Sequence, residues 1–348
     1  MSDVPHLRFP EFSGEWKETK LEKIAEITKG SGISKDQLSE HGSPCILYGE
    51  LYTKYKSEII NEVYSRTELD SSLLVKSKAN DVIIPCSGET AIDISTARCV
   101  PFNNILLGGD LNIIRLKNND GGFFAYQLNG TRKKDIARVA QGVSVVHLYG
   151  ENLKHIRVYH PAIEEQKKIT RLLSLIDERI ATQNKIIEKL QSLIKGLNDH
   201  ILKNIEGDQV CFADLGEAYG GLSGKSGDDF GCGDPFITYM NVYQNTYISE
   251  NDYELVQIAP DEKQNSVQYG DALFTLSSET PEEVGMGAVY LGKSQKLYLN
   301  SFCFGVHFHG NRVLPQYIAH FISSTSFRKA IYPLAQGSTR FNLQKRIL

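Results

Sequence analysis

The feature that most constrains this chain is a run of apolar residues, spaced alternately three and four apart, within residues 161–206. That spacing places the apolar side chains on one face of an α-helix, and nearly five heptads of it are typical of a coiled coil. Pro161 suits an early helix position, and Glu164 suits the positive helix N-terminus. We therefore predict one helix of about 60 Å, at 1.5 Å per residue, whose seam needs a partner helix. The predicted helix-packing positions are Ile169, Leu173, Ile176, Ile180, Gln183, Ile187, Leu190, Ile194, Leu197 and Ile201.

One position of this seam, Gln183, is polar. A polar core residue can fix the register of a coiled coil or its choice of partner. It can equally be a tolerated gap near the middle of a helix. The sequence gives the two interpretations equal weight.

The segments on either side of the predicted helix resemble each other. Four matches follow one another in the same order: 21–30 with 212–221, 42–48 with 233–239, 81–90 with 271–280, and 140–142 with 335–337. Their collinearity indicates a tandem duplication of one domain, with the long helix between the copies.

Within each copy, short β-type runs alternate with turn signals, which predicts a β-rich domain with a few short helices. The predicted fold class is α+β, with two tandem β-rich domains separated by a long coiled-coil helix. The predicted boundaries are 1–160 for the first domain, 161–206 for the helix and 207–348 for the second domain. Strands are predicted at 45–51, 82–86, 111–116, 236–242, 273–276 and 302–308, and helical segments at 123–139 and 315–331.

Composition excludes several classes of protein. The chain has 38 Lys and Arg against 42 Asp and Glu, a net charge of −4, so any nucleic-acid site must be a local patch or must be helped by a partner. With 41% hydrophobic residues, global disorder is excluded. No apolar stretch approaches the length of a membrane span, and the N-terminus lacks the pattern of a secretory signal, which predicts a cytoplasmic protein without a membrane segment.

The sequence also carries no recognisable catalytic motif. It has no GxxxxGK[ST] phosphate loop and no FxGxG cofactor motif, so we predict no cofactor and no catalytic residue. The six cysteines form no CxxC pair and are predicted to be reduced. His307 and His309 share a face of a predicted strand, where two half-exposed histidines are preferred over a metal pair, so no metal site is predicted.

Several motifs together resemble the specificity subunit of a type I restriction-modification system. They are the opening PHLRFPEFSGEWKETKLEKIAEITKG, the Ser-Gly-Glu-Thr of 87–90, the Gln141-Gly142 pair, and PAIEEQKKI at 161–169 leading into the long helix. The order of domain, helix and second domain covers essentially the whole chain. The resemblance implies a non-catalytic subunit whose two target-recognition domains read a two-part sequence in double-stranded DNA. It also implies that the helix acts as a spacer and holds methyltransferase subunits and, through them, restriction subunits.

The resemblance implies one element that the sequence lacks. The family usually has a second long helix after the second recognition domain, packed antiparallel on the first, and this sequence ends at Leu348 before such a helix. A fragment, a frameshift and a natural short form all remain open at this point. We expect part of the 169–201 seam to lack an intramolecular partner, and therefore predict self-association through this helix.

Candidate DNA-binding residues follow from loop position and residue type, because base edges and phosphates are contacted mainly by Arg, Lys, amides and hydroxyls. The loops that follow Gln141-Gly142 and the matching pair in the second copy are the strongest candidates, since both end in polar groups. In the first domain the candidates are Lys29, Ser31, Ser34, Lys35, Tyr52, Lys54, Lys56, Arg132, Lys133, Arg138, Gln141, Ser144 and His147. In the second domain they are Lys225, Asn241, Tyr243, Gln336, Ser338, Thr339, Arg340 and Asn342.

A second function remains open on the sequence alone. The chain could be a coiled-coil scaffold whose two β-rich domains bind proteins or carbohydrates, and its 17 Tyr and 15 Phe suit that interpretation as well. Salt separates the two hypotheses, because DNA binding weakens steeply as salt rises and carbohydrate binding does not.

Overall fold

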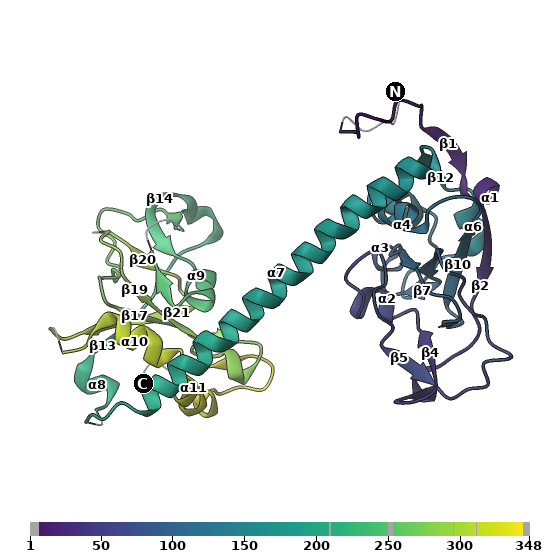
Figure 1. The fold of residues 1–348 in the computed structure, drawn as a ribbon. Coiled ribbons are helices and arrows are strands. Elements are labelled where there is room, and N and C mark those ends of the chain that lie inside the picture. Colours follow the sequence, from purple (N-terminus) through teal and green to yellow (C-terminus); the bar gives the residue numbers. More distant parts are fainter. Residues whose placement is uncertain (1–6, 209, 250–252, 295, 311, 344–348) are drawn as a thin grey trace. The chain divides into compact units, whose positions relative to one another are not determined.

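A computed structural model describes residues 7–208, 210–249, 253–294, 296–310 and 312–343 of the chain (Figure 1). The chain forms two compact units, Met1–Lys185 and Ile186–Leu348, each with its own sheets and core. Both units mix strands and short helices, and one long helix lies between the sheet-rich regions in sequence, as the predicted fold class requires. The predicted end of the second copy at Leu348 lies outside the described residues.

The first unit is built on two sheets that share a core. The central strand β6 (Asp81–Pro85) is buried along its whole length, and its side chains alternate between two apolar clusters. Val82 and Ile84 face the cluster that contains Phe123 and Phe124, whereas Ile83 faces the cluster that contains Ile46. In spatial order, the first sheet has the antiparallel strands β2 (Ala25–Lys29), β10 (Leu111–Leu116), β6 (Asp81–Pro85) and β8 (Arg98–Val100). The second sheet has β3 (Leu38–Ser39), β5 (Ser65–Thr67), β4 (Ser43–Ile46) and β9 (Leu106–Leu107).

Short elements complete the first unit. Two small ladders pair β1 (Lys17–Lys20) with β12 (Arg157–His160), and β7 (Ser87–Gly88) with β11 (Val146–His147). The helices are α1 (Leu21–Ile24), α2 (Glu50–Thr53), α3 (Ala91–Ile94), α4 (Gly121–Asn129), α5 (Lys133–Arg138) and α6 (Gly150–Lys154), with a 3-10 turn η1 at Lys35–Gln37.

The second unit repeats this design. Its main sheet has the order β13 (Gly216–Gly220), β21 (Cys303–Phe308), β17 (Ala272–Thr275), β19 (Gly287–Tyr290) and β15 (Tyr247–Ile248). A second sheet has β16 (Glu254–Val256), β14 (Phe230–Ile237) and β20 (Tyr298–Leu299), and a small ladder pairs β18 (Ser277–Ser278) with β22 (Phe341–Asn342). The helices are α8 (Phe212–Leu215), α9 (Tyr239–Gln244), α10 (Pro315–Ile322) and α11 (Thr325–Ile331), with 3-10 turns η2 (Gly227–Asp229), η3 (Pro281–Glu283) and η4 (Tyr332–Leu334).

Four strands have the same order in the main sheets of the two units, and β15 is added at the edge of the second. The order β2-β10-β6-β8 in the first unit becomes β13-β21-β17-β19 in the second, and β5-β4-β9 becomes β16-β14-β20. The α4–α5 pair likewise corresponds to α10–α11. Three of the corresponding pairs, β2 with β13, β4 with β14 and β6 with β17, overlap segments that match in sequence, so the structure supports the internal duplication.

Two of the predicted strands are wrong at their C-terminal ends. The strand predicted at 45–51 ends at Ile46, and α2 starts at Glu50, whose buried carboxylate accepts a hydrogen bond from the Leu47 amide (2.9 Å). The strand predicted at 236–242 ends at Ile237, because Thr238 and Asn241 form a capping box that starts α9. In both copies a polar residue starts a helix inside an apolar run.

The long helix α7 spans Ile163–Lys203, which are 41 residues, in agreement with the predicted helix. Glu164 and Glu165 lie in its first turn, and His200 and Lys203 lie in its last. Acidic residues at the N-terminus and basic residues at the C-terminus interact favourably with the helix dipole. No helix in the described part of the chain is both long enough and apolar enough to cross a membrane.

Candidate DNA interface and helix surface

The Gln-Gly motif of the first unit forms the base of a tight hairpin. Gln141 and His147 exchange backbone hydrogen bonds of 2.9 and 2.7 Å. The strand β11, at the end of the hairpin, also pairs with β7, which holds the Ser-Gly of the 87–90 motif. Gly142 has φ +123°, and a Cβ built there would lie 2.1 Å from the Val145 carbonyl oxygen. Only glycine fits this backbone.

The second unit holds the matching hairpin in the same way. Gln336 and Asn342 exchange hydrogen bonds of 2.9 and 2.8 Å, and β22 pairs with β18. Gly337 has φ +141°, and a Cβ there would lie 2.0 Å from the Arg340 carbonyl oxygen. The backbone of this hairpin is therefore a repeated feature of the chain. We name the two segments, 141–147 and 336–342, the first and the second hairpin.

Both hairpins present their candidate side chains to solvent. Two aromatic contacts order them: the His147 ring stacks on Tyr149 with centroids 6.2 Å apart, and the Arg340 guanidinium lies 5.6 Å from the centroid of Phe302. The exposed candidates are Gln141, Ser144 and His147 in the first hairpin, and Gln336, Ser338, Thr339, Arg340 and Asn342 in the second.

The other candidates of the first unit divide into exposed and internally bonded groups. Lys29, Lys35 and Lys56 are exposed, and Tyr52 is at the edge of exposure. Ser31 accepts a hydrogen bond from the Val75 amide, and Ser34 forms a capping box with Gln37 at η1. The loop that carries these serines lines a hollow of about 430 Å³, together with the residues that directly follow β4 and β9.

The remaining candidates of the first unit are basic, and three of them are paired. Lys54 donates to the Glu50 carboxylate at 2.6 Å and to Ser65, so its charge stabilises α2. Arg132 and Arg138 both pair with Asp135 on α5, at 3.3 and 3.1 Å. The Arg132 guanidinium also lies 5.0 Å from the centroid of the Tyr159 ring, while Lys133 is half-buried. Lys54, Arg132 and Arg138 therefore already have partners within their unit.

Three candidates of the second unit have structural roles. Lys225 is almost buried, where it pairs with Glu262 and donates to the Gln257 carbonyl at 2.6 Å. Hydrogen bonds from Lys225 and Gln264 lower the pKa of Glu262 to about 2. Asn241 caps α9, and Tyr243 donates to Glu283 at 2.9 Å, a bond that raises the pKa of Tyr243. In this arrangement the Lys225 side chain is enclosed and paired, and its contact with DNA stays a prediction.

A buried aspartate is a feature of both units that sequence reasoning missed. Asp81 accepts two hydrogen bonds from Arg115, at 2.9 and 2.7 Å, between neighbouring strands. Asp271, at the matching position, accepts from Tyr219 (2.7 Å) and contacts Nδ1 of His307 (2.8 Å). Burial and Asp271 together raise the pKa of Tyr219 above its usual range. The alignment of Asp81 with Asp271 was the available signal.

One of the two strand histidines, His307, has partners within its own unit. His307 is engaged by Asp271 and stacks on Tyr219 with centroids 4.1 Å apart. Among the residues that the structure describes, no group of three His, Cys, Asp or Glu side chains could hold a metal ion.

The start of α7 is fixed firmly to the first unit. Glu165 is buried and accepts two hydrogen bonds from Arg8, at 2.6 and 2.7 Å. Gln166 is also buried, accepts from the Asp120 amide and donates to Asn119, each at 2.9 Å. The Glu-Gln of the 161–169 motif therefore joins the helix to its domain.

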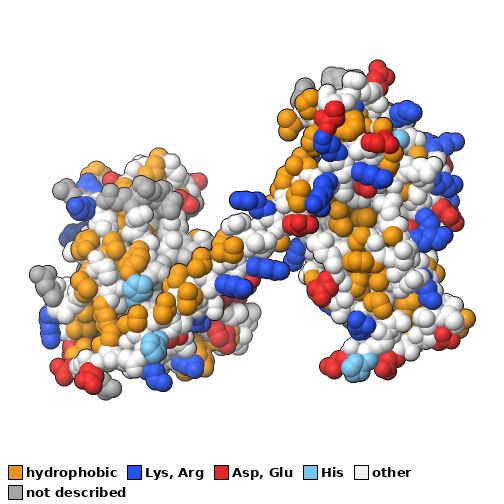
Figure 2. Space-filling model, viewed as in Figure 1, with side chains coloured by type: hydrophobic (Ala, Val, Ile, Leu, Met, Phe, Trp, Pro, Cys, Tyr) orange, Lys and Arg blue, Asp and Glu red, His pale blue; other side chains and the backbone are white. Residues whose placement is uncertain are grey.

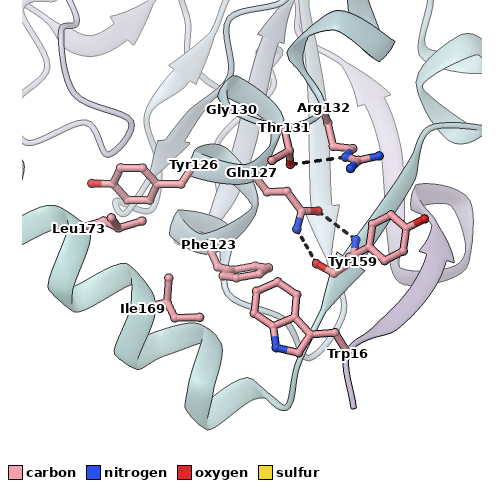
Figure 3. Close-up of a pocket in the computed structure, with 10 residues that line it drawn as sticks. All are labelled: Trp16, Phe123, Tyr126, Gln127, Gly130, Thr131, Arg132, Tyr159, Ile169 and Leu173. Carbon is pink, nitrogen blue, oxygen red and sulfur yellow. Dashed lines mark hydrogen bonds between the residues drawn. The ribbon is translucent and has the colours of Figure 1, made fainter. Parts of the chain in front are cut away.

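A hollow of about 400 Å³ lies beside this helix start (Figure 3). Ile169 and Leu173 point into it from α7, opposite Phe123 and Tyr126 of α4, and Trp16 closes one side. Tyr126 also donates to Asp177 on α7 at 2.5 Å. The first two predicted seam residues thus pack near the first unit rather than on a partner helix.

The rest of the seam is exposed. From Ile176 to Ile201 its apolar side chains keep 46–62% of their surface, and Figure 2 shows apolar side chains along this helix. Leu172, Ile186 and Leu193 lie one position before seam residues and are exposed too, so the apolar stripe is wider than a two-position seam. A stripe of that width suits a bundle of more than two helices. Gln183 is exposed, and its role stays open.

Comparison with known proteins identifies the family. A family model described as the type I restriction modification DNA specificity domain matches residues 13–192, which is more than half of the chain. The chain belongs to this family. Its function is to give a type I restriction-modification system its DNA sequence specificity, and members of the family bind DNA and work in complexes with methyltransferase subunits.

A solved structure supports the fold. The crystal structure of the type I restriction-modification S subunit from M. genitalium aligns with a TM-score of 0.56 and 14% identity, over 95% of this chain and 81% of that one. The HsdS subunit from Thermoanaerobacter tengcongensis aligns over 99% of this chain and 87% of that one at 13% identity, with a TM-score of 0.43, which is too low to add to the argument. The fold of this specificity subunit is therefore that of a known S subunit.

Proposed function

We propose that each unit of this specificity subunit reads one half of a two-part duplex sequence through its hairpin and the loops beside it. One observation carries the proposal: the two hairpins share a backbone and its glycine, yet they differ in almost every side chain between Gln and the final strand. A shared backbone with different side chains is what two readers of different half-sites need, because side chains at base edges carry the specificity.

The exposed residues are the proposed contacts. Lys29, Lys35 and Lys56 are placed to contact phosphates, which position a protein without reading sequence. The proposed base-reading groups are those of the hairpins, with Ser144 and Thr339 as hydroxyls at matching positions. Arg132 and Arg138 contribute only if DNA replaces their contacts with Asp135.

We propose that the exposed stripe of α7 binds the methyltransferase subunits, and through them the restriction subunits. Its width supports this, because one partner helix would leave part of the stripe exposed. The chain itself is then non-catalytic and needs no cofactor. Its net charge of −4 fits weak DNA affinity alone and a basic contribution from the partner. The domain boundaries after residues 160 and 206 and the cytoplasmic location of the protein remain predictions.

The test is selection from a random duplex DNA pool, with and without the cognate methyltransferase subunit. We expect a split motif with a fixed gap, enriched with the partner present. Enrichment of one half-site would mean that only one unit engages DNA. No enrichment by a complex that has demonstrably formed would contradict the proposal. Binding of the selected DNA should weaken steeply between 50 and 200 mM salt, by roughly three to five orders of magnitude for six to ten phosphate contacts.

A further inference from the structure

The two hairpins have opposite chemistry at their tips. Val143 and Val145 of the first align with Ser338 and Arg340 of the second. Val143 keeps 97% of its surface and Val145 keeps 54%, although the hairpin is bonded at its base. A third position changes in the same sense: Ile92, on the helix α3 that packs against β11, is 49% exposed and aligns with Glu282. The first unit therefore carries exposed apolar groups where the second carries polar ones.

Apolar side chains at a DNA-reading tip have one partner among base edges. In the major groove each base pair presents hydrogen-bonding groups, and thymine alone adds a methyl group, at C5. A valine can gain from that methyl group but can make no hydrogen bond with its side chain. Arginine has the opposite preference, since its two N–H groups match O6 and N7 of guanine.

The surroundings of each tip fit this division. Gly142 and the paired backbone hold the first tip in one shape, so its valines cannot fold back into the unit without breaking the hairpin. Arg340 lies over the Phe302 ring, itself half exposed, which orders the guanidinium before any base arrives. Ordering before binding lowers the entropy cost of the contact.

We propose that the first hairpin recognises thymine by its methyl group through Val143 and Val145, and that the second recognises guanine through Arg340. This inference rests on the proposed function and adds the kind of base that each half-site contains. Val145 and Arg340, which align with each other, are then the positions whose exchange changes base preference.

The experiment removes single groups from the DNA. Starting from the selected duplex, bound to the chain assembled with its methyltransferase subunit, each thymine is replaced in turn by uracil, which lacks only the methyl group. We expect one or two replacements in one half-site to weaken binding about three- to fourfold, as for one buried methyl group. In a Val143→Ser, Val145→Ser double variant that loss should disappear. In the other half-site, 7-deazaguanine should weaken binding about tenfold, and Arg340→Ala should abolish that effect.

A matched control is Val210→Ser, another half-exposed valine that lies outside both hairpins. It should leave every uracil effect unchanged. A uracil effect that persists in the double variant, or no uracil effect at any thymine, would overturn the thymine assignment. A 7-deazaguanine effect that persists in Arg340→Ala would overturn the guanine assignment. If instead Val143→Ser weakens assembly with the methyltransferase subunit, the valines bind protein and the inference is wrong. The selection itself tests the proposed function separately, because a split motif of any base composition supports that function.

Discussion

The buried pair of Asp81 and Arg115 makes the sharpest prediction about a single residue. The Asp81 carboxylate is 2% exposed, and the Arg115 guanidinium supplies two of its hydrogen bonds. Arg115→Ala would leave that charge buried without its cation, so we expect the free energy of unfolding to fall by about 2–4 kcal/mol. Urea denaturation, followed by a signal from the first unit, measures the loss.

The matched control is Arg157→Ala. Arg157 also forms a strand-to-strand ion pair, with Glu18 at 2.6 Å, but its side chain is 68% exposed. An exposed pair contributes at most about 1 kcal/mol. Equal losses for the two variants would show that burial of Asp81 does not set the strength of its pair.

The six cysteines give a second prediction at this scale. Burial raises the pKa of Cys45 and Cys86 to about 11, and of Cys99 and Cys303 to about 12, whereas Cys211 and Cys232 are exposed. Thiolates react and thiols do not, so iodoacetamide at pH 8 should label two cysteines quickly and four slowly. Mass spectrometry counts the labels, and urea should raise the number to six. Fast labelling of Cys99 in the native chain would contradict this burial.

At the scale of elements, the hairpins depend on one glycine each. We expect Gly142→Ala to disturb only the first hairpin, because a Cβ would meet the Val145 carbonyl and the positive φ costs about 1–3 kcal/mol. Binding of the selected DNA should weaken tenfold or more, with sequence preference lost at one half-site. Gly337→Ala should affect the other half-site. Gly14→Ala, where nothing lies within 4 Å, is the control. Loss of both half-sites in either single variant would contradict independent hairpins.

Local patterns explain which elements the sequence predicted. The run 111–116 is short, rich in Leu and Ile and bounded by turn residues, and it matches β10 residue for residue. The heptad run likewise predicted α7. The runs at 45–51 and 236–242 were predicted as strands to their ends because apolar composition does not distinguish a strand from a short helix that follows it. Asp81 and Arg115 lie 34 residues apart, so no local pattern joins them. For the same reason the sequence could not show that Lys225 pairs with Glu262, 37 residues away.

For the whole molecule, the exposed stripe of α7 decides the state of association. Side chains such as Ile187, Leu190 and Ile194 keep half or more of their surface, and long amphipathic helices are stabilised mainly by packing of the apolar face. We therefore expect the chain alone to self-associate at micromolar concentration and to exchange that contact for the methyltransferase subunit. Ile187→Glu with Ile194→Glu should reduce the mass measured by light scattering to that of one chain. Ser192→Glu, on the face opposite the seam, should leave it unchanged. If the chain without substitutions is monomeric, self-association is contradicted. The methyltransferase subunit would then be the proposed binding partner of the exposed stripe of α7. In that case the Glu variants should still abolish assembly, since the same apolar face would be charged.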